Sequence, residues 1–276
     1  MNVTHSLVLG ILQGFTEFLP ISSSGHLVIL QHYMGIKESV VFFNVMVHIG
    51  TLASVVVFFR KELYLIVLSV VKFSSRDKEY LFYRQIILAV LIGTLPTAFS
   101  GFILSKVKDF LFYGAVLPAG MLLFTGFFLW LGEKLSSNMR IPEKKQKPGI
   151  IDALFIGFMQ GVAIIPGISR SGTTISSGLI RGLGRKIAFR YSFLLFIPAA
   201  IGALVLESRE VNVAVASAPT LPFFLGTSTA FITGIIALTI LRKVLEEKKL
   251  VIFSWYCWIL GGSILFFEAM KVLTSL

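Results

Sequence analysis

Six stretches of the chain are apolar over about 20 residues each, which is the length at which an α-helix crosses the hydrocarbon core of a bilayer. Only 14% of the residues are charged, against about 25% in a typical soluble domain. The chain is therefore expected to be an all-α, polytopic membrane protein with about six transmembrane helices. The expected spans are 40–59, 85–104, 111–132, 187–206, 219–241 and 250–273.

Other features of the composition exclude several classes of protein. The N-terminal sequence MNVTHSLVLG has no Lys or Arg before its apolar run, so a cleaved secretory signal is not expected. The lone Cys257 excludes an internal disulfide framework. The net charge of +11 lies mainly in short loops between apolar spans, so it indicates orientation in the membrane and no nucleic-acid partner is expected.

One sixteen-residue motif occurs twice, 147 residues apart. GILQGFTEFLPISSSG (10–25) aligns without a gap with GFMQGVAIIPGISRSG (157–172), and seven positions are identical. Shared Gln, Ser and Gly residues are not what hydrophobicity alone would produce. The sequence therefore predicts one membrane domain over residues 1–276, built from a first repeat at 1–147 and a second at 148–276.

Each repeat begins with two short apolar arms separated by a Ser-rich break. Because each arm is too short to cross the bilayer, each pair is predicted to form a re-entrant helix hairpin, with full spanning of the first pair as the alternative. Three full spans then follow in each half, and an odd number of crossings predicts an inverted-topology repeat. The arms are 3–20, 25–36, 150–166 and 172–181.

The distribution of basic residues supports this layout. If the predicted 60–84 loop is cytoplasmic, then 133–149, 181–190 and 242–250 are also cytoplasmic, and the four segments hold 19 of the 25 Lys and Arg residues. The opposite side has only five Lys and Arg residues. The breaks are then expected to open to the extracytoplasmic side, where residues 37–39 emerge.

The breaks are predicted to form an anion site. Pro20 ends the first arm, and the caps that follow leave helix N-terminal N–H groups and a positive dipole end facing the break. Arg170 in the second break adds a guanidinium, which matches a phosphate in bidentate fashion. The alternative is that Arg170 only pairs with Glu17 to tie the repeats together. The predicted binding residues are Ser22, Ser24, Gly25, Ser169, Ser171, Gly172 and Thr174.

Two further residues in the first break indicate chemistry. Glu17, four residues after Gln13, is a candidate base or a ligand for a divalent cation, with Gln13 as a neutral oxygen ligand. His26, three residues after Ser23, is close enough in sequence to exchange a proton with a hydroxyl or a phosphate oxygen.

LQGFTEFLPISSSGH (12–26) and PGISRSGTT (166–174), supported by FNVMVHIGTLASVVVFF (43–59) and SFLLFIPAAIGA (192–203), resemble the bacterial undecaprenyl-diphosphate phosphatases of the bacitracin-resistance type. The resemblance covers nearly the whole chain. It implies an enzyme of the bacterial inner membrane that removes the terminal phosphate of undecaprenyl diphosphate and so regenerates the lipid carrier for peptidoglycan and other envelope polymers.

The resemblance also implies a catalytic set of Glu17, Ser23, His26 and Arg170, with Ser22, Ser169 and Thr174 as supporting phosphate-site residues. The family pattern has Glu or Gln at the position of Gln13. With Gln13 here, Mg²⁺ or another divalent cation such as Ca²⁺ is expected to be shared with the substrate diphosphate. The expected partners are the polyprenyl diphosphate substrate and membrane lipids, with a homodimer as a candidate assembly.

The main rival function is secondary transport or flipping of a polyprenyl phosphate lipid, since inverted repeats with broken helices are also transporter architecture. Transport has less use for Ser23 beside His26, so the sequence favours an enzyme. A purely structural scaffold does not explain charges kept inside the membrane.

Overall fold

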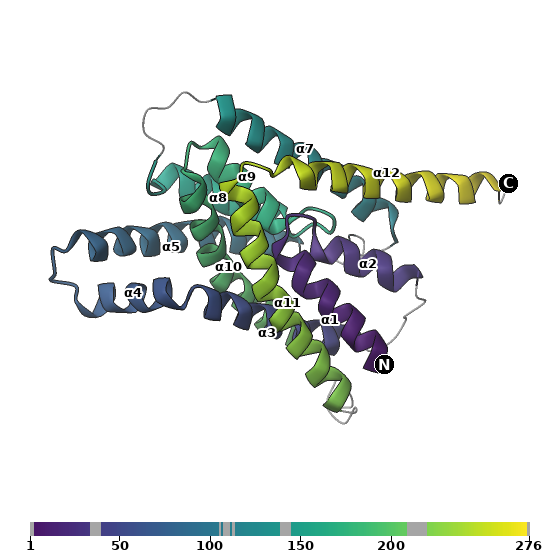
Figure 1. Ribbon diagram of the computed structural model, residues 1–276, viewed down its shortest axis with the longest axis horizontal. Coiled ribbons are helices and arrows are strands. Elements are labelled where there is room, and N and C mark those ends of the chain that lie inside the picture. The colour runs from purple at the N-terminus through teal and green to yellow at the C-terminus, as the bar shows by residue number, and fades with distance from the viewer. Residues whose placement is uncertain are drawn as a thin grey trace.

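The computed structural model describes residues 3–33, 40–104, 106, 111, 114–138, 145–208 and 220–274. Over these residues the fold is all-helical, as the sequence predicts, and it has no strand (Figure 1). The helices are α1 (Val3–Phe18), α2 (Ser23–Tyr33), α3 (Val40–Phe58), α4 (Arg60–Val71), α5 (Lys78–Leu104), α7 (Val116–Asn138), α8 (Ile150–Val162), α9 (Arg170–Ile180), α10 (Arg185–Ser208), α11 (Thr220–Glu246) and α12 (Val251–Thr274).

The predicted spans correspond to long helices. Among the described residues, α5, α7, α10, α11 and α12 are each long and apolar enough to cross a membrane, and α3 with α4 makes a sixth span if that bent pair is counted as one. Leu91, Leu95 and Phe99 are each more than 60% exposed and recur every four residues along α5. This spacing gives the helix one apolar stripe that suits contact with lipid tails.

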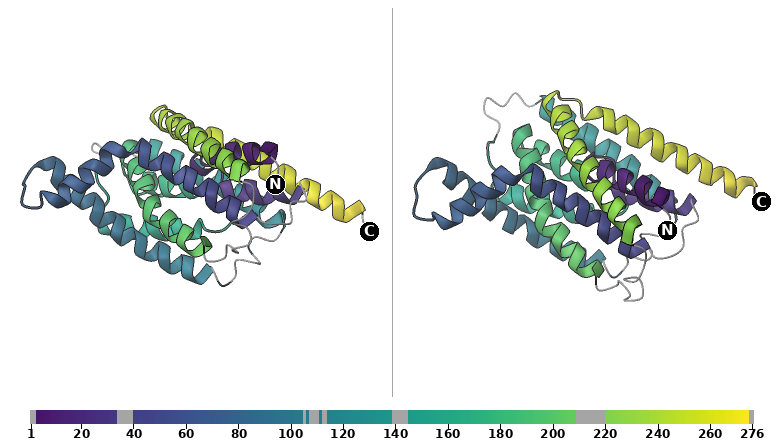
Figure 2. Two further views of the ribbon diagram at one scale, coloured as in Figure 1. Left: turned by 90° about the horizontal axis from the view of Figure 1, so that it is seen from below. Right: turned by 60° about the horizontal axis from the view of Figure 1, so that its bottom comes forward.

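The segment 60–84 differs from the predicted loop. It contains α4, which bends 70° away from α3, and the first turns of α5 (Figure 1). The charged residues that suggested a loop stabilise the turn between the two helices. Arg84 donates hydrogen bonds to the carbonyl oxygens of Ser69 and Lys72 at 2.8 and 2.6 Å, and Asp77 accepts one from the N–H of Glu79 at the start of α5. Figure 2 shows this hairpin at one end of the molecule and the C-terminus at the other.

The two predicted breaks are present and are capped in the same way. Ser22 accepts a hydrogen bond from the N–H of Gly25 at 3.2 Å, and Ser169 accepts one from the N–H of Gly172 at 3.2 Å. Gly167 has a φ of +94°, a conformation that only glycine adopts readily, and it lets the second break turn sharply before α9. The predicted caps are therefore confirmed, while residues 34–36 of the predicted second arm lie outside the described residues.

The arms pack on helices of the opposite half of the chain. α1 lies against α11, and α8 lies against α5. Each contact uses a pair of glycines one turn apart: Gly10 and Gly14 face α11, while Gly157 and Gly161 face α5. A Cβ on Gly157 would overlap the carbonyl oxygen of Gly93, so the α5 and α8 backbones touch directly. Small residues four apart allow this close approach between membrane helices.

Gly157→Leu is expected to destabilise the protein by about 1–3 kcal/mol or more, because the new side chain must push apart two helix backbones that cannot yield. The thermal midpoint of the purified protein in detergent measures this. Gly262→Leu on α12 is the control, since nothing lies within 4 Å of a Cβ at Gly262. Equal midpoints for the two variants would contradict the close packing.

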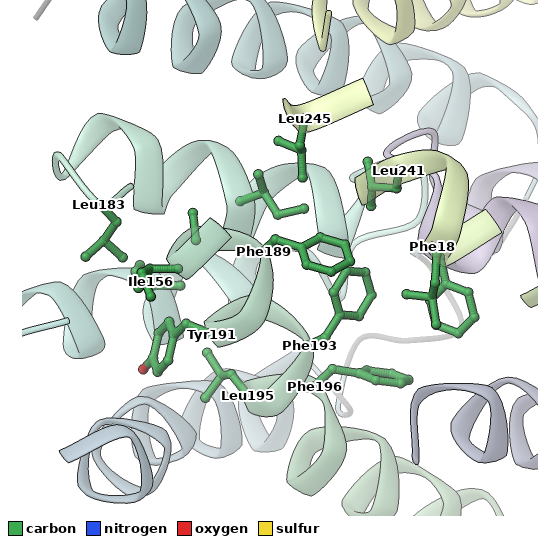
Figure 3. Packing of buried hydrophobic residues seen from close by; sticks show 14 of the residues in the cluster. Phe18, Ile156, Leu183, Phe189, Tyr191, Phe193, Leu195, Phe196, Leu241 and Leu245 are labelled. Atoms are coloured by element: carbon green, nitrogen blue, oxygen red, sulfur yellow. The ribbon is translucent and has the colours of Figure 1, made fainter. Parts of the chain in front are cut away.

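The largest core cluster packs α10 against α1, α3, α5, α8, α9 and α11, and Phe18, Phe189, Phe193 and Phe196 are among its aromatic members (Figure 3). The ring centroid of Phe193 is 5.7 Å from that of Phe18 and 5.0 Å from that of Phe189, both in edge-on arrangements. Phe196 also meets Phe18 edge-on. Arg170 in the second break lies over the rings of Phe193 and Phe196, and we call these two rings the aromatic floor.

The four basic segments predicted to share one side lie close together in the structure, and 242–250 reaches the others where Arg242 and Glu246 line one cavity with Glu62 and Arg185. Arg185 pairs with Glu133 through two hydrogen bonds of 2.6 and 2.9 Å, and Lys145 forms an isolated β-bridge with Leu183. Arg190 lies 3.5 Å from Glu62. Asp152 at the start of α8 accepts a hydrogen bond from the N–H of Gly149 and pairs with Lys145 and Arg181. We call this side the basic face.

Candidate active site at the junction of the two breaks

The two breaks touch each other. The hydroxyl oxygen of Ser22 in the first break accepts a hydrogen bond from the N–H of Gly167 in the second at 3.1 Å, in addition to the one from Gly25. Ser22 has a φ of +69°, an uncommon conformation for a residue with a side chain. The structure therefore brings together two segments that lie 145 residues apart, as the repeat predicts.

Glu17 and Arg170 form an ion pair across this junction. Nη2 of Arg170 lies 2.6 Å from Oε1 of Glu17, and the two side chains are only 14% and 8% exposed. The guanidinium also contacts the aromatic floor, with its Cζ 3.5 Å from the ring centroid of Phe196. Nη1 of Arg170 is buried and has no partner among the described residues. The guanidinium thus ties the two halves together and still has N–H groups for an anion.

Ser23 directs its hydroxyl at the same carboxylate. Its Oγ donates to Oε2 of Glu17 at 2.5 Å, and Nε2 of Gln13 donates to the same oxygen at 3.0 Å. Ser23 is half-buried, so its hydroxyl is reachable from the site. A hydroxyl held by a carboxylate is an activated nucleophile, because the carboxylate can take its proton.

His26 has different neighbours from those expected. Its Nδ1 lies 2.7 Å from the carbonyl oxygen of Ser22, and its Nε2 lies 2.8 Å from the hydroxyl of Tyr256 on α12. Because a carbonyl only accepts, Nδ1 carries a proton, and Nε2 of the neutral ring accepts from the phenol. The planes of the two rings are within 9° of parallel. Nothing in the sequence marks Tyr256, which follows Trp255 in an apolar span and resembles an interfacial aromatic residue.

The second break contributes a matching set of hydroxyls. Ser169 and Ser171 have their Oγ atoms 3.3 Å apart, as Ser22 and Ser24 do at 3.4 Å. Thr174, one turn further along α9, instead meets Ser192 of α10 at 2.5 Å. Its hydroxyl is therefore used within the protein.

Thr125 of α7 also supports the second break and was not identified from the sequence. Its hydroxyl donates to the carbonyl oxygen of Gly167 at 2.8 Å and accepts from the N–H of Ser169 at 3.0 Å. In the first break, Cys257 of α12 donates to the carbonyl oxygen of Pro20 at 3.8 Å. Thus α7, the last long helix of the first half, supports the second break, and α12, the last of the second half, supports the first break.

The arrangement favours an anion. Both α2 and α9 begin at the junction, at Ser23 and Arg170, so two helix N-termini and one guanidinium face it. The positive ends of helix dipoles attract phosphate groups. The fixed carboxylate and hydroxyl beside them add a base and a nucleophile.

A divalent cation finds only part of its coordination here. Among the described residues, no group of three or more His, Cys, Asp and Glu side chains is suited to hold a metal ion. Oε1 of Gln13 is buried without a partner beside Glu17, so the two residues offer oxygen ligands on one face of α1. Mg²⁺ takes six oxygens and usually keeps waters and substrate phosphates among them. The residues therefore fit a cation that the substrate helps to hold.

Comparisons with known proteins agree with these features. The family model described as Bacitracin resistance protein BacA matches residues 6–263. A protein of Carboxydothermus hydrogenoformans named Undecaprenyl-diphosphatase is 40% identical over 272 residues, which are 98% of each chain. Proteins of the same name from Desulforapulum autotrophicum and Methanobrevibacter smithii are 41% and 34% identical, and each alignment covers 95% of this chain and 96% of the relative.

Proposed function

This chain belongs to the bacitracin resistance protein BacA family, and from that premise we propose that it is a multi-pass membrane hydrolase that converts undecaprenyl diphosphate and water into undecaprenyl phosphate and inorganic phosphate. The observation that carries the proposal is the chain of contacts from Arg170 through Glu17 to Ser23, set at the start of two helices. It offers an anion clamp, a base and a nucleophile within one junction.

We propose that Arg170 and the N-termini of α2 and α9 hold the terminal phosphate. Their positive charge neutralises the charge that spreads over the phosphoryl oxygens as the bond to the leaving phosphate breaks. The orientation of Arg170 is fixed in advance by Glu17 and by the ring of Phe196. Little reorganisation is then needed when the substrate binds.

Ser23 is the proposed nucleophile. As its Oγ attacks the terminal phosphorus, Glu17 accepts its proton and the bond from phosphorus to the bridging oxygen breaks. Water then hydrolyses the phosphoserine and restores the hydroxyl. The alternative route has no phosphoserine. In it a water molecule, oriented by Ser23 and deprotonated by Glu17, attacks the terminal phosphorus directly.

His26 is proposed to exchange a proton with a phosphate oxygen. The hydrogen bonds to the Ser22 carbonyl and to Tyr256 fix the orientation of its ring. A divalent cation such as Mg²⁺, held by Glu17, Gln13 and the diphosphate, would supply further charge neutralisation.

The two hairpins are proposed to enter the bacterial inner membrane from opposite faces, with the junction open to the extracytoplasmic side. The matching caps, the exchange of arms between halves and the gathering of the basic segments support this arrangement. The expected entrance beside residues 37–39 lies outside the described residues. A homodimer stays a prediction.

The test is phosphate release by the purified protein from a polyprenyl diphosphate in detergent with Mg²⁺. Release by the parent, with almost none from His26→Ala and Arg170→Ala while both remain folded, supports hydrolysis. Arg84→Ala is the control, since that side chain binds backbone carbonyls and the ring of Phe73 in the α4–α5 turn, outside the junction. A folded parent that releases no phosphate but speeds lipid exchange between leaflets would instead indicate transport.

Tyr256→Phe is expected to lower kcat by about 10-fold with little change in KM, because one hydrogen bond orienting His26 is lost while the phosphate clamp stays intact. Steady-state kinetics in detergent separates the two constants. Tyr64→Phe on the exposed surface of α4 is the matched control. A rise in KM with an unchanged kcat would show that Tyr256 serves substrate binding alone.

A further inference from the structure

A cavity lined by charged and aromatic side chains lies on the basic face, away from the junction of the breaks. It has a volume of about 220 Å³ and lies between the α3–α4 bend, the start of α10 and the end of α11. One water occupies roughly 30 Å³ in the liquid, so this space has room for a phosphate group and the atoms bonded to it. None of its lining residues belongs to the proposed catalytic set.

The charges in the cavity leave a small positive excess. The lining cations are Arg185, Lys186, Arg190 and Arg242, and the lining anions are Glu62 and Glu246. Arg190 is close to Glu62, and Arg185 is paired with Glu133. Among the described residues, neither Lys186 nor Arg242 has an ion pair within 4 Å. These two cations against the single remaining carboxylate match a ligand with one negative charge.

Arg185 provides an independent sign of a ligand. Its side chain is only 9% exposed, and although its two terminal nitrogens bind Glu133, its Nε is buried without a partner among the described residues. A buried N–H donor without a partner costs free energy, which an acceptor in the cavity would recover. Arg185 is also the first residue of α10, whose positive dipole end favours an anion.

The walls around these charges are apolar. Phe58, Phe59 and Phe189 line the cavity, and Phe189 belongs to the aromatic cluster of Figure 3. Val57 of α3 and Ile240 of α11, each close in sequence to the cavity residues, are 40% exposed on the outer surface. An occupant with a charged head and apolar tails would therefore meet suitable surfaces at both ends.

We propose that this cavity binds the phosphodiester headgroup of an anionic phospholipid from the leaflet on the basic face. A phosphodiester carries one negative charge and has acceptor oxygens for Lys186, Arg242 and Nε of Arg185. Its acyl chains lie along the exposed apolar faces of α3 and α11. Basic pockets at the ends of membrane helices are suited to such headgroups. The bound lipid joins α3, α10 and α11 below the aromatic floor of the catalytic junction.

The experiment titrates the detergent-purified protein with dioleoyl-phosphatidylglycerol and counts bound lipid by native mass spectrometry. Lys186→Ala with Arg242→Ala is expected to weaken binding by about 30-fold, since two charges near a membrane surface are lost. The control, Lys61→Ala with Lys243→Ala, removes two exposed charges near the same face that do not line the cavity. It is expected to change binding by less than about threefold.

Three results would overturn the proposal. Equal losses in the two double variants would show general attraction between charges. Equal binding of dioleoyl-phosphatidylcholine would show that the cavity does not select the net negative charge of the headgroup. A rise in the thermal midpoint with inorganic phosphate, as large as that with phosphatidylglycerol in the parent and lost in Lys186→Ala with Arg242→Ala, would assign the cavity to a soluble anion. The single variant Lys186→Gln keeps the test open if the double variant is unstable, and a loss of about fivefold is then expected.

Discussion

Arg170→Lys is expected to lower the rate of phosphate release by about 10³-fold or more, although it keeps the positive charge. A lysine can still pair with Glu17, but its single ammonium cannot bind that carboxylate and a phosphate through separate arms of a planar fork. The kcat of the purified variant on a polyprenyl diphosphate measures the loss. The midpoint of thermal unfolding reports whether the two halves remain joined.

Arg185→Lys is the matched control for this variant. Arg185 is another buried arginine paired with a carboxylate, but its partner Glu133 lies on α7, outside the junction. It is expected to lose stability and to keep most of its turnover. If Arg170→Lys also retained a near-parental kcat, Arg170 would serve only to tie the repeats together.

Ser23→Ala is expected to reduce turnover by at least about 10³-fold, because it removes the one hydroxyl that binds Glu17 in the described part of the chain. The variant should remain folded, since a half-buried hydroxyl is replaced by a smaller side chain. Ser177→Ala is the control: this serine lies on α9 and its buried hydroxyl has no partner among the described residues.

Acid quenching with a substrate labelled in its terminal phosphate separates the two routes. Label bound to the parent and absent from Ser23→Ala would indicate a phosphoserine. Strong loss of activity without trapped label would favour water oriented by Ser23. If Ser23→Ala retained more than about one tenth of the parental kcat, Ser23 would be neither the nucleophile nor the residue that orients the attacking water.

The sequence was sufficient to predict the spans and the meeting of the breaks. Apolar runs of about 20 residues allow little else in a bilayer, and a repeated motif with Pro20 and Arg170 points to paired breaks. The ion pair between Glu17 and Arg170 follows from that pairing, because two buried charges of opposite sign need each other.

Contacts that depend on the rotation of a long apolar helix were not predictable. Tyr256 reaches His26, and Phe196 lies beneath Arg170, only because α12 and α10 turn particular faces toward the junction. A helix that is apolar on all sides carries no periodic signal for that rotation. The helix α4 was missed for a related reason, since its charged first turn resembles the end of a span.

The exchange of arms between the halves determines when this protein can become active during its synthesis. α1 is made first, but its main packing partner, α11, is among the last segments to leave the ribosome. Until then the glycines of α1 lack the helix that they pack on, and His26 lacks Tyr256 of α12. A nascent chain that stops before residue 220 thus inserts most of its helices and still lacks a finished catalytic centre.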